Sequence, residues 1–192
     1  MFGIILAKKK SERLALNKAL IEIEGETLIE RTIRIIKPYC KDILIISDDE
    51  RLNRFGKRFE DIFKEKGPIS GIYTGLYYSE EEENLVLASD MPFLKPSLIE
   101  YIIRNTKYKN VGGDFQAIIP EIEGKKEPLC AIYLKGCLPL IKEEIENNRL
   151  SLKGLIERLN VKYVDCDEFR DCFFNLNTKE DLILARKEAH RN

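Results

Sequence analysis

Histidine and tryptophan are almost absent from this sequence of 192 residues. The chain has no Trp and a single His, His190, which lies two residues before its end. A Ser-His-Asp triad needs a histidine beside its nucleophile, and many zinc sites use several, so we expect neither kind of site. An excess of charge is also missing, since 32 Lys and Arg residues are matched by 33 Asp and Glu residues. This balance argues against a protein that coats nucleic acid through a global positive field.

Long apolar runs and paired cysteines are missing as well. No stretch approaches the roughly 20 apolar residues that cross a bilayer. The first ten residues, MFGIILAKKK, are apolar and then basic, which is the reverse of a secretory signal. The cysteines are scattered and form no C-x-x-C pair, which favours reduced thiols: they are Cys40, Cys130, Cys137, Cys166 and Cys172. We therefore expect a cytoplasmic protein that binds neither a membrane nor nucleic acid.

Hydrophobic patterning predicts an α/β fold. Short apolar runs at residues 2–7, 43–46 and 85–88 are typical of buried parallel strands. Further strands are predicted at residues 117–119, 129–133 and 161–164. Helices are predicted from Thr27 to a stop at Pro38, at 50–65, at 70–79 with Ser70 as cap, at 96–106, 137–147 and 151–159, and from Thr178 onwards. We predict one domain over residues 1–192, with a mostly parallel twisted sheet flanked by helices.

The loop after the first strand is rich in cations. It contains, within eleven residues, Lys8, Lys9, Lys10, Arg13 and Lys18. Ligands of parallel sheets bind at the carboxyl ends of strands, and clustered cations there suit a polyphosphate. The loop has no glycine, so it fits neither a P-loop nor a Rossmann fingerprint. A solvated basic loop is the alternative interpretation of this cluster.

A carboxylate follows a second predicted strand. Asp90 comes directly after the run 85–88, in the segment Ser89-Asp90-Met91-Pro92-Phe93. Mg²⁺ prefers one or two carboxylates together with phosphate oxygens, so Asp90 is a candidate magnesium ligand. Its position also allows it to cap the helix that follows.

Five motifs in order resemble the molybdenum cofactor guanylyltransferase family. Residues 6–18, LAKKKSERLALNK, align without gaps with the family's L-A-G-G-x-S-x-R-M-G-x-D-K. The others are GPISG at 67–71, DMPF at 90–93, EPLCAIY at 127–133 and NLNTKEDL at 175–182. The chain departs from the pattern where Lys8 and Lys9 replace glycines, Leu14-Ala15 replaces Met-Gly, and Asn17 replaces Asp. The two lysines either crowd the nucleotide or replace backbone N–H contacts to phosphate.

The resemblance implies a Rossmann-like architecture of the kind found in nucleotide-diphospho-sugar transferases. It also implies Mg²⁺-dependent transfer of GMP from GTP to the phosphate of molybdopterin, with release of pyrophosphate. By the same resemblance Asp90 holds the metal, Lys18 contacts phosphate and Arg13 is a second cation for the leaving pyrophosphate. The remaining nucleotide contacts fall on Leu6, Ala7, Lys8, Ser47, Asp61 and Gly71, and the pterin side on Asn175 and Asn177. Transient contact with proteins that deliver the cofactor or mature molybdoenzymes is expected.

Two other functions stay open at this point. One is a sister enzyme on the same fold that uses CTP or another phosphate acceptor. The other is a non-catalytic nucleotide- or cofactor-binding protein, which the altered glycine loop would suit. Both Asn175 and Asn177 also have a purely structural interpretation, as helix caps and loop hydrogen-bonding groups.

Overall fold

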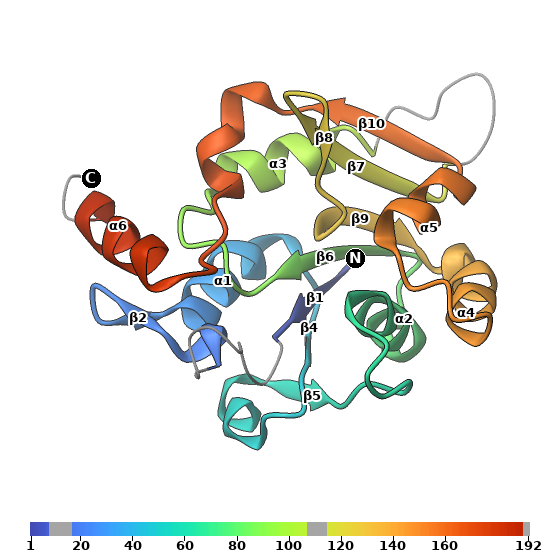
Figure 1. The fold of residues 1–192 in the computed structure, drawn as a ribbon, viewed down its shortest axis with the longest axis horizontal. Helices are drawn as coiled ribbons and strands as arrows, with labels where there is room; N and C mark the ends of the chain where they lie inside the picture. The colour runs from blue at the N-terminus through green and yellow to red at the C-terminus, as the bar shows by residue number, and fades with distance from the viewer. Residues whose placement is uncertain (8–16, 107–114, 190–192) are drawn as a thin grey trace.

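A computed structural model describes residues 1–7, 17–106 and 115–189 (Figure 1). Its main sheet has the order β10-β7-β9-β6-β1-β4-β5, with β8 paired to β7. The strands are β1 (Phe2–Leu6), β4 (Ile43–Ile46), β5 (Lys57–Phe59), β6 (Glu83–Ala88), β7 (Ala117–Ile122), β8 (Lys125–Lys126), β9 (Cys130–Leu134) and β10 (Val161–Asp165). The pairs β1–β4, β1–β6, β4–β5 and β10–β7 are parallel, whereas β9 is antiparallel to both neighbours. The predicted α/β class and mostly parallel sheet are confirmed.

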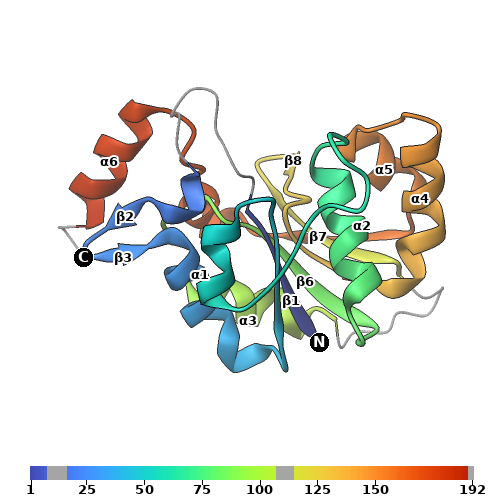
Figure 2. The ribbon, with the colours of Figure 1, turned by 90° about the horizontal axis from the view of Figure 1, so that it is seen from below.

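Helices cover both faces of the sheet. One face carries α1 (Leu28–Ile36) and α3 (Pro96–Arg104), and the other carries α2 (Pro68–Tyr78), α4 (Leu138–Glu146) and α5 (Leu152–Arg158) (Figures 1 and 2). Helix α6 (Lys179–Ala189) packs beside the hairpin of β2 (Glu22–Ile23) and β3 (Glu26–Thr27). The described residues also form short 3₁₀ helices, which are η1 (Lys18–Leu20), η2 (Lys37–Tyr39), η3 (Glu50–Phe55), η4 (Lys135–Cys137) and η5 (Asp167–Phe173).

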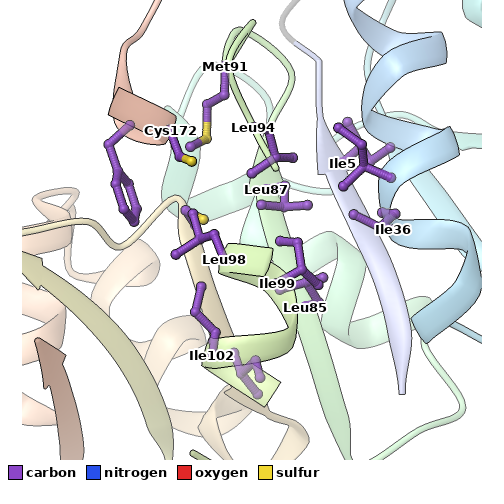
Figure 3. Close-up of a cluster of buried hydrophobic side chains, with 14 of the residues drawn as sticks. Ile5, Ile36, Leu85, Leu87, Met91, Leu94, Leu98, Ile99, Ile102 and Cys172 are labelled. Atoms are coloured by element: carbon purple, nitrogen blue, oxygen red, sulfur yellow. The ribbon is translucent and has the colours of Figure 1, made fainter. Parts of the chain in front are cut away.

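Strand β1 lies at the centre of the core. Successive side chains of a strand point to opposite faces, so Ile5 packs towards α1 and α3 while Ile4 packs towards α2. Both side chains are fully buried. Figure 3 shows the first of these layers, where Ile5 and Ile36 lie close to Leu87 and the α3 side chain Ile99. Burial on both faces explains why the strand is an uninterrupted apolar run.

Local signals fix the ends of several helices. At α1, Thr27 and Glu30 form a capping box, in which Glu30 N donates to Thr27 Oγ1 and Thr27 N donates to Glu30 Oε2 at 2.9 Å. At α6, Asp181 N donates to Thr178 Oγ1 at 3.1 Å, and Thr178 N donates back to the Asp181 carboxylate at 2.8 Å. These two starts lie where the sequence predicts them.

The predicted helix over residues 50–65 is wrong. Those residues form η3, then β5, and then a loop that ends at the start of α2. Gly56 has a φ of 151°, which L side chains rarely adopt, and it separates η3 from the strand. The apolar stripe is divided between the two faces, since Leu52 packs towards α1 and Phe59 and Phe63 pack towards α2. Parallel pairing with β4 thus prevails over helical periodicity.

The predicted start of the next helix is also wrong. Helix α2 begins at Pro68, with Gly67 as its N-cap residue, so Ser70 lies within the first turn. The Ser70 hydroxyl donates to the carbonyl oxygen of Phe63 at 2.7 Å and is fully buried. It ties the preceding loop to α2 and does not cap the helix.

The described cysteines are all free thiols, and four of the five are buried. None of the helices in the described ranges combines the length and apolar character that a bilayer span requires.

Candidate active site at the carboxyl ends of the parallel strands

Strands β1, β4, β5 and β6 end at the same edge of the sheet. Backbone hydrogen bonds continue past the strand ends, because Ala7 N donates to Ile46 O at 2.9 Å and Ser47 N donates to Phe59 O at 2.9 Å. On the other side of β1, Ser89 N donates to Leu6 O at 3.1 Å. Backbone hydrogen bonds therefore hold Leu6, Ala7 and Ser47 beside the segment that carries Asp90, at the carboxyl edge where ligands of such sheets are expected to bind.

A lysine and an aspartate pair at this edge. Lys18 Nζ lies 2.8 Å from Asp90 Oδ2 and 2.6 Å from Asn177 Oδ1. The Lys18 and Asp90 side chains are each 19% exposed, so the pair is partly buried but still within reach of a ligand. The helix-cap interpretation of Asp90 is wrong, because α3 has Lys95 at its N-cap and no side-chain cap. The structure brings together Lys18, Asp90 and Asn177 from three distant parts of the chain.

Next to Lys18, the buried side chains of Asn17 and Asp49 form a hydrogen-bonded pair. Asn17 accepts a hydrogen bond from Ala19 N at 3.0 Å, which caps η1, and donates to Asp49 Oδ2 at 2.9 Å. Asp49 N in turn donates to Ser47 Oγ at 3.1 Å. Hydrogen bonds from Arg51 hold the pKa of Asp49 well below its usual range, because they outweigh the opposing effect of burial. Sequence reasoning missed Asp49, whose signal is limited to its place just after a strand end.

Asp61 and Gly71 meet on the α2 side of the edge. Asp61 Oδ1 is buried and has no hydrogen-bond partner among the described residues. Burial raises the pKa of Asp61 to about 6, and the nearby Asp48 carboxylate acts in the same direction. A Cβ added at Gly71 would lie 3.0 Å from Leu6 Cδ2 and 3.7 Å from that Asp61 oxygen. The absent side chain thus leaves room where Leu6 and Asp61 approach each other.

A cavity of about 260 Å³ lies at the carboxyl edge of the sheet, on the side of Asp90 away from Asp61 and Gly71. Its polar lining comes from Asp90, Asn175, Asn177 and Glu127, and its apolar lining includes Pro128, Leu129 and Leu152. The segment with both asparagines is fixed to the strand end, because Leu176 N donates to Asp90 O at 2.9 Å. The helix-cap interpretation of the asparagines does not hold, since Thr178 and Asp181 cap α6.

The two asparagines hydrogen-bond within this loop, as the structural alternative expects. Asn175 Nδ2 donates to Phe173 O at 3.0 Å, and Asn177 Nδ2 donates to Asn175 O at 3.4 Å. Asn177 also accepts a hydrogen bond from Lys18, so its side chain helps to hold the lysine beside Asp90. Two predicted site residues, Lys8 and Arg13, lie outside the described residues.

The donor set suits a metal that arrives with a phosphate ligand. In the ranges 1–7, 17–106 and 115–189, no three His, Cys, Asp or Glu side chains come together as a metal cage. Asp90 offers one partly exposed carboxylate beside the cavity. Mg²⁺ accepts this arrangement, because it keeps several waters and binds through one or two carboxylates plus substrate phosphates.

A mostly parallel α/β sheet with a lysine, an aspartate and a cavity at its carboxyl edge is the arrangement expected of a nucleotidyltransferase. Residues 3–162 match the MobA-like NTP transferase domain, and the chain belongs to that family. The resemblance found in the sequence motifs is thereby confirmed. A "Probable molybdenum cofactor guanylyltransferase" of Clostridium perfringens strain 13 is 35% identical over 197 residues, which span 96% of each chain.

Solved structures agree with this assignment. Molybdopterin-guanine dinucleotide biosynthesis protein A from Archaeoglobus fulgidus superposes with a TM-score of 0.83 at 25% identity, over 100% of both chains. The 2-C-methyl-D-erythritol 4-phosphate cytidylyltransferase of Thermus thermophilus has a TM-score of 0.69 at 15% identity, over 99% of this chain and 100% of its own. This second likeness concerns the fold alone.

Proposed function

We propose that the protein is a molybdenum cofactor guanylyltransferase, which transfers GMP from GTP to the terminal phosphate of molybdopterin and releases pyrophosphate. The observation that carries this proposal is the Lys18–Asp90 pair, which lies between the strand ends and a cavity lined by Asn175 and Asn177. The names of the full-length relatives support GTP and molybdopterin as the two substrates.

The nucleotide would bind on the β1–β4–β5 side of Asp90. Leu6 and Ala7 would contact it through backbone atoms, and Ser47, Asp61 and Gly71 would line the nucleoside. Asp61 supports this role through its buried oxygen, which has no hydrogen-bond partner in the part of the chain that the structure describes. From the loop 8–16 we assign Lys8 to the nucleotide and Arg13 to the leaving pyrophosphate.

Asp90 would hold Mg²⁺, and the bound ion would neutralise charge on the phosphates. Lys18 would bind phosphate oxygens with its ammonium group, after exchanging its hydrogen bond with Asp90 for one with the nucleotide. Asn177 would keep Lys18 at the cavity during this exchange. Transfer of this kind depends mainly on positioning and charge stabilisation.

No strong base is needed at the acceptor. A phosphate monoester oxygen already carries negative charge near neutral pH, so it attacks the α-phosphorus while pyrophosphate leaves with the original bond pair. The P–O bond to the acceptor forms as the bond between α- and β-phosphates breaks, and no proton has to be removed. Asn175 and Asn177 would orient the pterin that carries this phosphate.

The experiment that tests the proposal uses α-labelled GTP, Mg²⁺ and molybdopterin with the full chain. We expect a labelled dinucleotide together with pyrophosphate. A wild-type protein that binds GTP but forms no product, under conditions where a family enzyme does, would overturn catalysis in favour of a binding role. Calorimetry with GTP and with CTP tests which nucleotide the protein prefers, and we expect GTP to bind more tightly.

We also propose that residues 1–192 act as one domain, because β10 and η5 pack onto the same sheet and core as β1. The free thiols fit work in the cytoplasm. Transient contact with cofactor-delivering or molybdoenzyme-maturing proteins would supply the substrate and receive the product.

A further inference from the structure

Glu127 has no partner for its charge among the described residues. It lies in the link between β8 and β9, and its side chain lines the cavity beside Asp90. Within the described part of the chain, no hydrogen bond or ion pair reaches its carboxylate, and the side chain is half-buried. Burial raises the pKa of Glu127, against the weaker opposing effect of Lys125. An acid so placed costs folding free energy unless something else satisfies it.

The backbone holds this carboxylate in place. Glu127 N donates to Pro120 O at 2.9 Å, and Cys130 N donates to Glu127 O at 3.1 Å. The link is also tied to β6, since Ala88 N donates to Leu129 O at 2.8 Å, two residues before Asp90. The position of Glu127 relative to the metal-binding aspartate is therefore set by three main-chain hydrogen bonds.

The rest of the cavity suits a flat, polar-edged ring. Pro128, Leu129 and Leu152 supply apolar surface for the ring faces, while Asn175 and Asn177 supply amides. A carboxylate accepts two parallel hydrogen bonds when a ligand presents two adjacent N–H groups, as arginine does in proteins. Pterins present such a pair, the ring N–H and the exocyclic amine of the 2-amino-4-oxo edge.

We propose that Glu127 is the residue that recognises the acceptor, by accepting two hydrogen bonds from the 2-amino-4-oxo edge of its pterin ring. This inference rests on the proposed function and adds a specificity-determining residue to it. It assigns the unpaired carboxylate to binding and leaves phosphate transfer to Asp90 and Lys18.

Guanine carries the same pair of N–H donors as a pterin. The position of Glu127 relative to Asp90 therefore indicates which of the two rings it would bind. Glu127 precedes β9, which lies next to β6 on the side away from β1 (Figure 1). Asp61 and Gly71, the candidates for the nucleoside, lie by β5 and α2, beyond β1. Each side of Asp90 therefore has one acid whose carboxylate lacks a full set of partners among the described residues: Asp61 has a buried oxygen without a hydrogen bond, and the half-buried Glu127, on the side of the cavity, has no hydrogen bond or ion pair to its carboxylate.

The test compares Glu127→Gln with a matched variant, Glu121→Gln, in the full chain. Glu121 lies on β7 of the same hairpin and does not line the cavity. For each protein the KM for molybdopterin, kcat, the GTP dissociation constant by calorimetry and the Tm are measured. In E127Q the amide would turn an N–H towards the donors of the pterin, so we expect the molybdopterin KM to rise at least about tenfold.

The other readouts separate recognition from structure. With recognition, kcat and GTP affinity stay within about twofold of wild type and the Tm does not fall, because no partner is lost. A molybdopterin KM unchanged in E127Q overturns the inference, as does a loss of GTP affinity with normal acceptor KM. A fall in Tm together with losses for both substrates also overturns it, in favour of a structural role. Absence of any dinucleotide from wild type would instead refute the proposed function itself.

Discussion

Lys18 Nζ donates a hydrogen bond to Asp90 Oδ2 across 2.8 Å, although the two residues are 72 positions apart. The pair joins the start of η1 to the segment after β6, and Lys18 also donates to Asn177 in the 175–177 segment. In the absence of nucleotide each charge satisfies the other, so neither is left buried without a partner. In the proposed function, binding of a nucleoside triphosphate with Mg²⁺ would replace this contact with charge-assisted contacts at both groups.

Asp90→Asn removes the charge that would hold the metal. We expect kcat for dinucleotide formation to fall about 10²–10³-fold, as for other groups that stabilise developing charge. The fold persists, because a partly exposed ion pair contributes at most about 1 kcal/mol. Rates at saturating GTP and Mg²⁺ test this, with Asp171→Asn as control, since that side chain is 87% exposed. An unchanged rate in D90N would remove Asp90 from the metal role.

Lys18→Met removes the ammonium that would bind phosphate. The GTP dissociation constant should rise about 10–100-fold, which corresponds to the loss of one or two charge-assisted hydrogen bonds. Calorimetry at one fixed salt concentration measures this effect. Lys57→Met is the matched control, because Lys57 pairs with Asp42 in an exposed ion pair outside the site. Equal GTP affinity of K18M and K57M would contradict the assignment.

Asp61→Asn should stabilise the fold while weakening nucleotide binding. The folded pKa of about 6 exceeds the ordinary value of 3.8, so the carboxyl favours the folded state below about pH 4 and loses that contribution as pH rises through 6. At pH 8 the variant should gain about 1 kcal/mol in the free energy of unfolding, discounted for partial exposure. Urea unfolding at pH 4 and pH 8 tests the sign.

Two further measurements complete the Asp61 experiment. Asp48→Asn removes the neighbouring charge that also raises the pKa of Asp61, so it should give a smaller gain in the same direction. GTP affinity should fall in D61N, because an amide cannot accept two hydrogen bonds from N–H or O–H donors in the way a carboxylate does. A stability of D61N at pH 8 below that of wild type would contradict the burial argument.

Asn17→Asp restores the residue found at this position in the family motif, yet it should destabilise this chain. Asn17 Nδ2 lies 2.9 Å from Asp49 Oδ2, and Asp49 is 3% exposed, so the variant would place two carboxylates in contact. We expect a loss of about 1–3 kcal/mol at pH 7, which shrinks at low pH as the raised pKa of the pair allows protonation. Asn53→Asp is the control, because Arg58 faces that exposed side chain. Equal stability of N17D and N53D would refute this interaction.

Gly75→Ala tests the packing that positions β1. A Cβ at Gly75 would overlap the side chain of Ile4, which is fully buried in the central strand. Overpacking of this kind costs about 1–3 kcal/mol, which chemical denaturation measures. Gly136→Ala is the matched variant, since the nearest atom to its Cβ would be Glu82 Oε1 at 4.0 Å. A G75A protein as stable as G136A would show that α2 and β1 are loosely packed.

The starts of α1 and α6 and the buried strand β1 were predictable from the sequence. Thr27 and Glu30, and Thr178 and Asp181, stand at spacings that satisfy helix N-termini without any other part of the chain. The uninterrupted run at β1 predicts a strand covered on both faces. The stretch 50–65 was not predictable, because its apolar residues face two different layers and its strand exists only through pairing with β4.

The candidate site also has features that the sequence predicts and features that depend on the fold. The sequence alone is enough to propose Lys18, Asp90, Asn175 and Asn177 as site residues, since they stand in recognisable motifs after strand ends or before a capped helix. Which of these residues lie together depends on the fold, which brings Lys18, Asp90 and Asn177 into contact. The fold also places Asn17 against Asp49, and Glu127 at the cavity with no partner among the described residues. Contacts between residues far apart in the chain depend on sheet order and packing, which leave no local pattern in the sequence.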